Sequence, residues 1–203
     1  MSQVVAIDLD GTLISCGPRH CALMHQVCSG DTTRPDFLAR YWADKREGAS
    51  NVGALRAQGH PAAMSRAQAW AREIEHWPWL GFDSLLPGVA RALTACHRPV
   101  TVLTARREAL FLHQQLDRLG LMRLIDELVV VSPAEATRAK ADALARLRPV
   151  TFIGDTESDA NAACAAGSPF IALHCGMRSA AYWRSRGLQS LPDLTAALAA
   201  LPA

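Results

Sequence analysis

The sequence predicts an α/β fold: a parallel sheet covered by helices, with one helical unit inserted. Three observations predict it. After Pro87, short apolar strands alternate with helical segments, whereas residues 19–85 are rich in helix formers and poor in β-branched residues. Ahead of both, an apolar run at residues 4–7 ends in two acidic residues. Strands separated by helices need crossover connections, and these build a parallel sheet. We therefore expect a Rossmann-like core with helices on both faces at residues 1–18 and 86–203, and a helical cap at 19–85.

Length and charge limit the classes of function. At 203 residues the chain suffices for one domain with a sizeable insertion and needs no disulfide or structural metal to form a core. The net charge is only +2 and no basic run occurs, so nothing favours nucleic acid as a partner. Neither a signal peptide nor an apolar run of transmembrane length is visible. We expect a soluble, cytoplasmic protein, a monomer or homodimer, that binds a small molecule and no membrane.

The six cysteines indicate reduced thiols and no disulfide framework. They lie at positions 16, 21, 28, 96, 164 and 175, without C-x-x-C pairs. One cluster suggests a metal site, since Cys21, His25 and Cys28 follow His20 at helical spacing. Because zinc-ligand spacing is missing, we interpret this cluster as one face of an amphipathic helix.

The first strand carries the strongest chemical signal. Its apolar residues end abruptly at Asp8 and Asp10, which are followed by Gly11 and Thr12. In an open parallel sheet, ligands bind outside the carboxyl ends of the strands, so both carboxylates are expected to face a site. Gly11 allows the chain to turn away there without a Cβ clash. A short acidic motif of this kind also occurs in ordinary turns, so its meaning depends on the residues downstream.

The inserted segment shows helical punctuation and no nucleotide-binding motif. Glycines at 48, 53 and 59 break it into several helices. Gly48 and Gly53 have the outer spacing of a phosphate-binding P-loop, but Ala54-Leu55 stand where Lys and Ser or Thr are required, which excludes a nucleotide kinase of that type. Another pattern is a stripe of Trp70, Ile74 and Trp77 at helical spacing, which we interpret as core.

After Pro87, the sequence alternates regularly between predicted helices and strands. Ser132 is the expected N-cap of one helix, with Pro133 at its first position and Glu135 as the capping-box partner. The expected helices are 89–96, 107–119, 132–147, 158–166 and one after Pro192, and the expected strands are 100–103, 128–131, 150–153 and 170–173.

Polar residues follow two of these strands as Asp8 and Asp10 follow the first. Thr104 ends one strand, and Asp155 follows another, in a segment that also holds Asp159. Lys140 lies on the helix before that second strand. Each residue alone has an ordinary explanation as a cap, a turn residue or a solvated lysine. Two acidic strand ends, a hydroxyl strand end and a lysine in this order indicate a shared site.

This combination suits phosphoryl transfer. Asp8 can attack phosphorus as a nucleophile, and Asp10 can protonate the leaving oxygen and then accept a proton from water. We expect Asp8 to be ionised and Asp10 protonated at the first step, as in other close carboxyl pairs. Converging carboxylates would repel one another without a cation, and Mg²⁺ prefers such hard oxygen ligands, with Asp8 and Asp155 as its expected partners. Thr104 would bind phosphoryl oxygens, and Lys140 would neutralise charge.

With these residues in hand, the chain resembles the haloacid dehalogenase-like (HAD) superfamily. The four motifs of that superfamily correspond to Asp8-Leu9-Asp10-Gly11-Thr12-Leu13, Leu103-Thr104-Ala105-Arg106, Lys140, and Gly154-Asp155-Thr156-Glu157-Ser158-Asp159. The resemblance spans nearly the whole chain and is closest to the phosphoglycolate-phosphatase-like branch with a helical C1-type cap, although no proline follows Lys140.

The resemblance implies a role for each matching residue. It makes Asp8 the nucleophile and a metal ligand, and Asp10 the acid/base that also binds metal through its backbone carbonyl. Asp155 becomes a metal ligand, and Asp159 a partner of a metal-bound water or of the lysine. Thr104, with Ala105 and Arg106 beside it, becomes part of the substrate-binding set. The implied protein is an Mg²⁺-dependent phosphatase for a small phosphorylated metabolite.

Alternatives remain open. Dehalogenases, phosphonatases and P-type ATPases of the family carry other residues in place of Asp10, so phosphate-ester chemistry is favoured, but a sugar phosphomutase uses the same motifs. A phospho-accepting signalling module would carry its aspartate on a middle strand and lack the insertion. A silent binding protein would have no chemical need for all four motifs.

The cap should close over the site and contact the leaving group. Lys45, Arg46 and Asn51 are the candidates for substrate contact there, because they lie at a break between helices flanked by Gly48 and Gly53. A solvated polar loop is the alternative for these residues.

Overall fold

The structure, a computed structural model, describes residues 4–28 and 36–202. Its core is a six-stranded sheet in which neighbouring strands run parallel, in the order β5-β4-β1-β6-β7-β8. This confirms the predicted α/β fold with a parallel sheet. The strands are β1 (Val5–Ile7), β4 (Val100–Ala105), β5 (Glu127–Val131), β6 (Thr151–Gly154), β7 (Phe170–Leu173) and β8 (Ser190–Leu191).

Side-chain alternation along β1 explains why helices cover both faces of the sheet. Val5 and Ile7 point into a cluster with α5, α6 and α10, whereas Ala6 points into a second cluster with α7 and α8. All three side chains are fully buried, so neither face of β1 meets solvent. The core helices are α5 (Val89–Thr94), α6 (Ala109–Arg118), α7 (Ala136–Leu147), α8 (Glu157–Ala166), α9 (Ala180–Ser185) and α10 (Leu194–Ala199).

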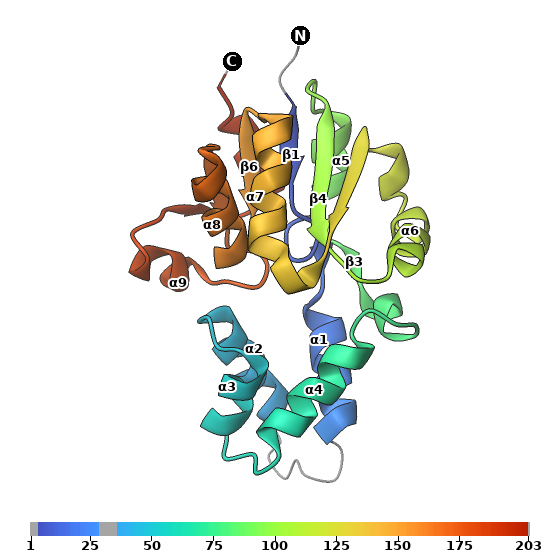
Figure 1. Ribbon diagram of the computed structural model, residues 1–203, viewed down its shortest axis with the longest axis vertical. Helices are drawn as coiled ribbons and strands as arrows, with labels where there is room; N and C mark the ends of the chain where they lie inside the picture. Colours follow the sequence, from blue (N-terminus) through green and yellow to red (C-terminus); the bar gives the residue numbers. More distant parts are fainter. Residues whose placement is uncertain (1–3, 29–35, 203) are drawn as a thin grey trace.

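The inserted helices form a small unit with a core of its own, which we call the cap. Met24, Tyr41, Leu55 and Ala67, one from each helix, are buried together in a cluster separate from those of the sheet. Figure 1 shows this unit at the end of the sheet opposite both chain termini, facing the carboxyl ends of the strands. The cap helices are α1 (Gly17–Cys28), α2 (Phe37–Arg46), α3 (Asn51–Ala57) and α4 (Ala63–Glu73).

A two-stranded ribbon connects the core with the cap. β2 (Ile14–Ser15) pairs antiparallel with β3 (Ser84–Leu85), so the chain leaves and re-enters the core side by side. The first cap helix begins at Gly17, two residues before the expected boundary, because the ribbon ends there. A 3-10 turn, η1 (Trp79–Phe82), precedes β3 on the return.

The tryptophan stripe was interpreted as core, and that prediction is wrong for Trp77. The Trp77 side chain is 37% exposed, and its Nε1 donates a hydrogen bond to Gln114 Oε1 at 3.1 Å. Ile74 is buried as expected. Helical spacing ends at Glu73, where α4 stops, so Trp77 no longer shares the buried face.

The helix expected from Ser132 is two elements. A 3-10 turn, η3 (Pro133–Glu135), comes first, with Ser132 Oγ accepting a hydrogen bond from the Ala134 amide at 3.4 Å, and α7 begins only at Ala136. Another 3-10 turn, η2 (Leu121–Arg123), follows α6. Among the described residues, no helix combines the length and the apolar character that crossing a membrane requires.

Candidate active site

Three neighbouring strands bring the predicted catalytic side chains to one edge of the sheet. β1 lies between β4 and β6 and is in parallel register with both. Asp8 directly follows β1, Thr104 lies near the end of β4, and Asp155 directly follows β6. The Asp8 amide donates to the carbonyl of Ile153 at 2.8 Å, which continues the ladder beyond β1. All three of these polar side chains are buried although they lie beyond an apolar core.

Lys140 bridges two of the acidic residues. Its Nζ donates to Asp8 Oδ1 and to Asp159 Oδ1, each at 2.6 Å, and the lysine is only 4% exposed. The other oxygen of Asp159 accepts hydrogen bonds from the amide and the hydroxyl of Thr156, at 3.1 and 2.6 Å. Asp159 is therefore the partner that fixes Lys140 at the N-terminus of α8, one of the two roles expected for it.

Asp155 is fully buried, as is Asp159. Its Oδ2 accepts a hydrogen bond from the Met177 amide at 2.6 Å, and its Oδ1 accepts one from the Thr12 hydroxyl at 3.3 Å. Burial, and then the negative charges of Asp8 and Asp159, raise the pKa of Asp155 well above its usual value. The carboxylate is therefore placed by specific donors in an environment that disfavours its negative charge.

The three carboxylates fit a divalent cation. One ligand oxygen each from Asp8, Asp155 and Asp159 lie within 4.8 Å of one another. Among the described residues, the ammonium group of Lys140 pairs with Asp8 and Asp159, so full ionisation of the three acids would leave negative charge uncompensated. Carboxylate oxygens are the ligands that Mg²⁺ prefers. Asp8 and Asp155 would hold the ion; the predicted role of the Asp10 carbonyl stays a prediction.

The pKa of Asp8 gives the expected pH dependence of metal binding. Burial raises this pKa to about 7, although Lys140 opposes the shift. Below that pH the carboxyl is protonated, and Mg²⁺ must displace the proton, so acid should weaken binding. We expect the dissociation constant of Mg²⁺ to rise roughly tenfold for each pH unit lost below 7 as one proton is displaced. Calorimetry at pH 6 and pH 8 measures this, and equal affinities would contradict it.

Asp10 is held by two arginines. Arg106 donates from Nε to Asp10 Oδ2 and from Nη2 to Oδ1, both at 2.8 Å, and Arg19 also contacts Oδ1. Arg19 comes from the cap helix α1 and bridges onward to Asp83 at 3.2 Å. Arg106 comes from the end of β4. The acid/base candidate is thus joined to both the cap and the core.

Without substrate or metal, the protein favours the opposite protonation of the carboxyl pair from the one expected at the first step, and the expectation for that step stays a prediction. Burial raises the pKa of Asp10, but Arg106 and Arg19 outweigh it and lower this pKa to about 2, whereas that of Asp8 is raised. Asp10 is therefore the carboxyl of the pair that ionises more readily, and Asp8 is the one that binds a proton more readily. The sequence does not reveal this difference, because only the fold brings Arg106 and Arg19 into contact with Asp10.

Gly11 is needed because the acidic cluster leaves no room beside it. It has a φ of +84°, and an added Cβ would lie 2.0 Å from Asp155 Oδ2. Gly120 has a similar φ of +71° with nothing near the Cβ position. We expect Gly11→Ala to lower the free energy of unfolding by about 1–3 kcal/mol more than Gly120→Ala, because the backbone strain is matched and only the crowding differs. Urea unfolding of both variants measures the difference, and equal losses would contradict it.

A cavity of about 290 Å³ lies over these groups, between core and cap. The core side includes Asp8, Thr104, Ala105 and Lys140, as expected for a phosphoryl-binding end. The cap side was not predicted, since only folding brings its residues here; it consists of Arg19, His20, Trp70, Ile74 and Glu75. His20 is buried against the rings of Trp42 and Trp70, and burial lowers its pKa well below the usual value, which keeps it neutral.

The proposed cap contacts lie elsewhere. Asn51 accepts a hydrogen bond from the Tyr41 hydroxyl at 3.0 Å inside the cap. Arg46 donates to the main-chain oxygens of His174 and Arg178 in the core. Lys45 is buried, and burial lowers its pKa to about 8, but it does not line the cavity. The structure thus gives Arg46 and Asn51 contacts within the protein, and the expected contact of these residues with substrate stays a prediction.

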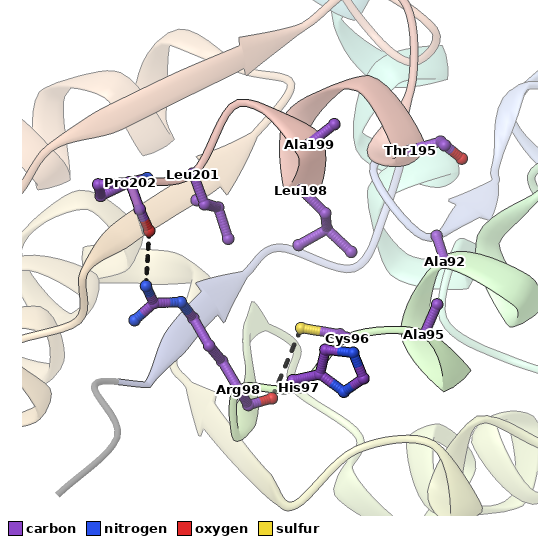
Figure 2. A pocket seen from close by; sticks show the side chains of 10 residues that line it. All are labelled: Ala92, Ala95, Cys96, His97, Arg98, Thr195, Leu198, Ala199, Leu201 and Pro202. Carbon is purple, nitrogen blue, oxygen red and sulfur yellow. Dashed lines mark hydrogen bonds between the residues drawn. The ribbon is translucent and has the colours of Figure 1, made fainter.

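A larger cavity lies at the opposite end of the sheet. Figure 2 shows this space, about 420 Å³, beside Arg98 and the C-terminal helix α10. Arg98 precedes β4, so the cavity is separated from Asp8 by the length of the strands. Two of its polar groups are engaged, since Arg98 donates to the carbonyl of Pro202 at 2.6 Å and the Cys96 thiol faces the carbonyl of Arg98 at 3.5 Å. None of the described residues that line it is acidic, so it is not a candidate for this chemistry.

Solved structures resemble this fold along its whole length. A predicted phosphatase from Clostridium acetobutylicum aligns with a TM-score of 0.70 and 18% identity over 95% of this chain and 94% of that one. A Lactobacillus delbrueckii subsp. bulgaricus protein with a provisional phosphoglycolate phosphatase name aligns with a TM-score of 0.69 and 18% identity over 100% of both chains. A HAD family hydrolase from Deinococcus radiodurans, with bound phosphate and sodium, gives 0.64 and 22% over 97% and 93%. At sequence identities this low, the similarity shows that the fold is shared and nothing more.

Sequence comparison identifies the family. A search among curated proteins finds no significant match. The profile of the haloacid dehalogenase-like hydrolases, in contrast, matches residues 3–167, which include all four motifs and the cap. Together with the acids at the carboxyl ends of β1 and β6 and the lysine between them, this match shows that the chain belongs to the haloacid dehalogenase-like hydrolases.

Proposed function

We propose that the protein is an Mg²⁺-dependent phosphatase that hydrolyses a small phosphate monoester through an aspartyl-phosphate. One observation carries the proposal: Lys140 joins the buried Asp8 to Asp159, while Asp155 lies in the same cluster and Asp10 stands beside it in the cavity. A nucleophilic carboxylate, a group that neutralises its charge and a second carboxyl for proton transfer are what two-step hydrolysis of an ester requires.

In the first step, an oxygen of Asp8 attacks phosphorus and the bond from phosphorus to the leaving oxygen breaks. Lys140, at 2.6 Å from Asp8 Oδ1, fixes the carboxylate and balances charge that builds up on the phosphoryl oxygens. When bound, Mg²⁺ supplies Lewis-acid stabilisation of that charge. Thr104, which is buried and lines the cavity, would donate a hydrogen bond to a phosphoryl oxygen.

Asp10 has to act in both steps. It gives a proton to the leaving alcohol, and as a carboxylate it then takes a proton from the water that cleaves the aspartyl-phosphate. Its two arginine contacts favour the ionised form, which suits the second step. For the first step, at least one guanidinium contact has to give way as substrate enters, so that an oxygen of Asp10 can carry the proton.

The cavity supports a small substrate. Its volume is about 290 Å³, and Trp70, Ile74 and the buried His20 line its cap side. With a phosphoryl group at the core side, the remaining volume suits a small leaving alcohol. A small phosphorylated metabolite is therefore the proposed substrate class.

Phosphate release from a panel of phosphate monoesters, with Mg²⁺ and with EDTA, tests the proposal. We expect release from at least one small ester, dependent on Mg²⁺. A panel with no release from any ester would overturn the general phosphatase proposal. Transfer of the phosphoryl group within a sugar phosphate, without release, would instead indicate a phosphomutase.

Replacing Asp10 with Asn should separate the two steps. An alkyl phosphate needs the proton from Asp10, so its turnover should fall by about 10²–10⁴-fold. p-Nitrophenyl phosphate has a leaving group that departs without a proton, so the first step should survive and the second should slow. We expect a burst of nitrophenol close to one per enzyme, followed by slow release, in stopped-flow absorbance.

Asp117, an exposed acid on α6, provides the matched control. Asp117→Asn should behave as the wild type with both esters. Equal losses with the two esters in Asp10→Asn, and no burst, would show that Asp10 does not transfer the proton.

A further inference from the structure

The cap contacts the core at a second place, far from the ribbon. The end of α2 meets the segment that leads from β7 into α9, and Figure 1 shows these elements facing each other across the two units. The Ser179 amide donates to the Arg46 carbonyl at 3.0 Å. The Ser179 hydroxyl donates to Glu47 Oε1 at 2.5 Å. Residues 174–179 therefore hold the cap by its α2 end; we name them the docking segment.

Arg178 is the centre of this contact. Its Nη1 donates to the Lys45 carbonyl of the cap at 2.8 Å, and its Nε and Nη2 form a paired contact with Glu157, both at 2.7 Å. The side chain is 7% exposed and lies over the ring of Tyr182 at 5.2 Å. A planar guanidinium satisfies all these partners at once, which an ammonium cannot. Glu157 stands between Asp155 and Asp159 in the chain, so one side chain joins the cap to the acidic loop.

The same docking segment touches the metal-binding acid directly. The amide of Met177, the residue before Arg178, donates to Asp155 Oδ2 at 2.6 Å. At Gly176 an added Cβ would lie 2.2 Å from both Asp155 Oδ2 and the Gly11 carbonyl. The backbone of residues 176–177 is closely packed against Asp155 and Gly11, so a displacement of Arg178 would also displace the Met177 amide and the Asp155 carboxylate.

We propose that Arg178 is a positioning residue that couples the docking of the cap to the placement of Asp155. With the cap docked, Arg178 is held by Lys45 and Glu157 together, and the Met177 amide fixes one oxygen of Asp155. When the cap swings away, the Lys45 and Arg46 contacts are lost, and the docking segment gains freedom next to Asp155. Cap closure and tight metal binding therefore favour each other, and by linkage Mg²⁺ should favour the docked cap.

Two substitutions and one control test the coupling. Arg178→Met removes the contacts to the cap and to Glu157. Arg46→Met removes only contacts from the cap to the main chain of the docking segment and touches no acid of the site. Arg186 also lies over Tyr182, at 5.7 Å, but is exposed, so Arg186→Met is the matched control.

Titration calorimetry with Mg²⁺ alone, without substrate, is the first measurement. We expect the dissociation constant to rise about tenfold in Arg178→Met and about threefold in Arg46→Met, which are couplings in the usual range. Arg186→Met should stay within about twofold of the wild type. Wild-type affinity in both variants, or a change confined to Arg178→Met, would overturn the coupling, because the cap would then have no effect on the metal site.

Hydrogen exchange of the metal-free protein is the second measurement, and it does not depend on the proposed function. We expect Arg46→Met to speed exchange of the peptide that contains the Met177 amide, as well as peptides at the end of α2. Faster exchange at α2 alone would overturn the coupling. If the wild type binds no Mg²⁺, the metal of the proposed function is wrong, while exchange at Met177 still decides whether the cap acts on this segment.

Discussion

Replacing Asp8 with asparagine is expected to lower kcat for phosphate release by roughly 10⁴-fold or more, as losses of a covalent nucleophile do. Asparagine keeps the size of the side chain but has no carboxylate to attack phosphorus. The contact of Lys140 with Asp159 at 2.6 Å remains, so the lysine stays in place. Rapid acid quenching of enzyme with radiolabelled p-nitrophenyl phosphate measures the same step: labelled protein should form in Asp10→Asn and be absent in Asp8→Asn.

The control for Asp8→Asn is a check that the variant is still folded. Asp8 is buried, and burial raises its pKa, so a neutral side chain is tolerated there electrostatically. We expect the circular dichroism spectrum of Asp8→Asn to match the wild type. Residual turnover above a thousandth of the wild-type rate in a folded variant would show that Asp8 is not the nucleophile.

The fold and the acidic cluster were predictable because local sequence determines both. Asp8 and Asp155 each stand directly after a short apolar strand, and the parallel arrangement brings such strand ends together. Lys140 was found from its order relative to these acids. The strands of the core contain few polar residues, so their apolar pattern is clear in the sequence. Because helices connect these strands, the sheet is expected to be parallel.

The cap side of the site could not be predicted, because tertiary contacts alone bring it there. Arg19 looks like any arginine at the start of a helix, and its pairing with Asp10 depends on the angle at which α1 leaves the ribbon. Arg178 reaches across to a carbonyl more than a hundred residues away, that of Lys45. The prediction for Arg46 and Asn51 rested on a break between helices. Polar residues at such a break can contact substrate or other parts of the protein, and here Arg46 contacts the core while Asn51 contacts Tyr41.

The two arginines on Asp10 and the lysine on Asp8 give the carboxyls different environments. Asp10 is one-quarter exposed at its side chain and has two cationic partners, whereas Asp8 is 7% exposed and shares one lysine with Asp159. The pKa of Asp10 is therefore lowered and that of Asp8 raised. A cation at Asp8 would reverse that difference in part, because it favours the ionised nucleophile. Metal binding thus favours the ionised form of Asp8, and the loss of an arginine contact when substrate binds favours the protonated form of Asp10.

In Lys140→Met, Mg²⁺ should restore part of the lost stability without restoring activity. The buried Asp8 and Asp159 would lose their cation, and removing one partner of a buried pair costs about 3–5 kcal/mol of unfolding free energy. We expect that loss in EDTA. Mg²⁺ should recover part of it, since the same carboxylates then have a cation again, and its affinity should rise because a competing positive charge is gone. Urea unfolding with EDTA and with Mg²⁺ measures both effects.

Activity should not recover with stability. Mg²⁺ would neutralise the cluster, but the donor at 2.6 Å from Asp8 Oδ1 would be missing, so kcat should fall by about 10²–10³-fold even in saturating Mg²⁺. Arg138, exposed two residues earlier on α7, is the matched control, and Arg138→Met should change neither quantity. Full activity of Lys140→Met in Mg²⁺ would mean that the lysine serves only to compensate charge in the metal-free protein.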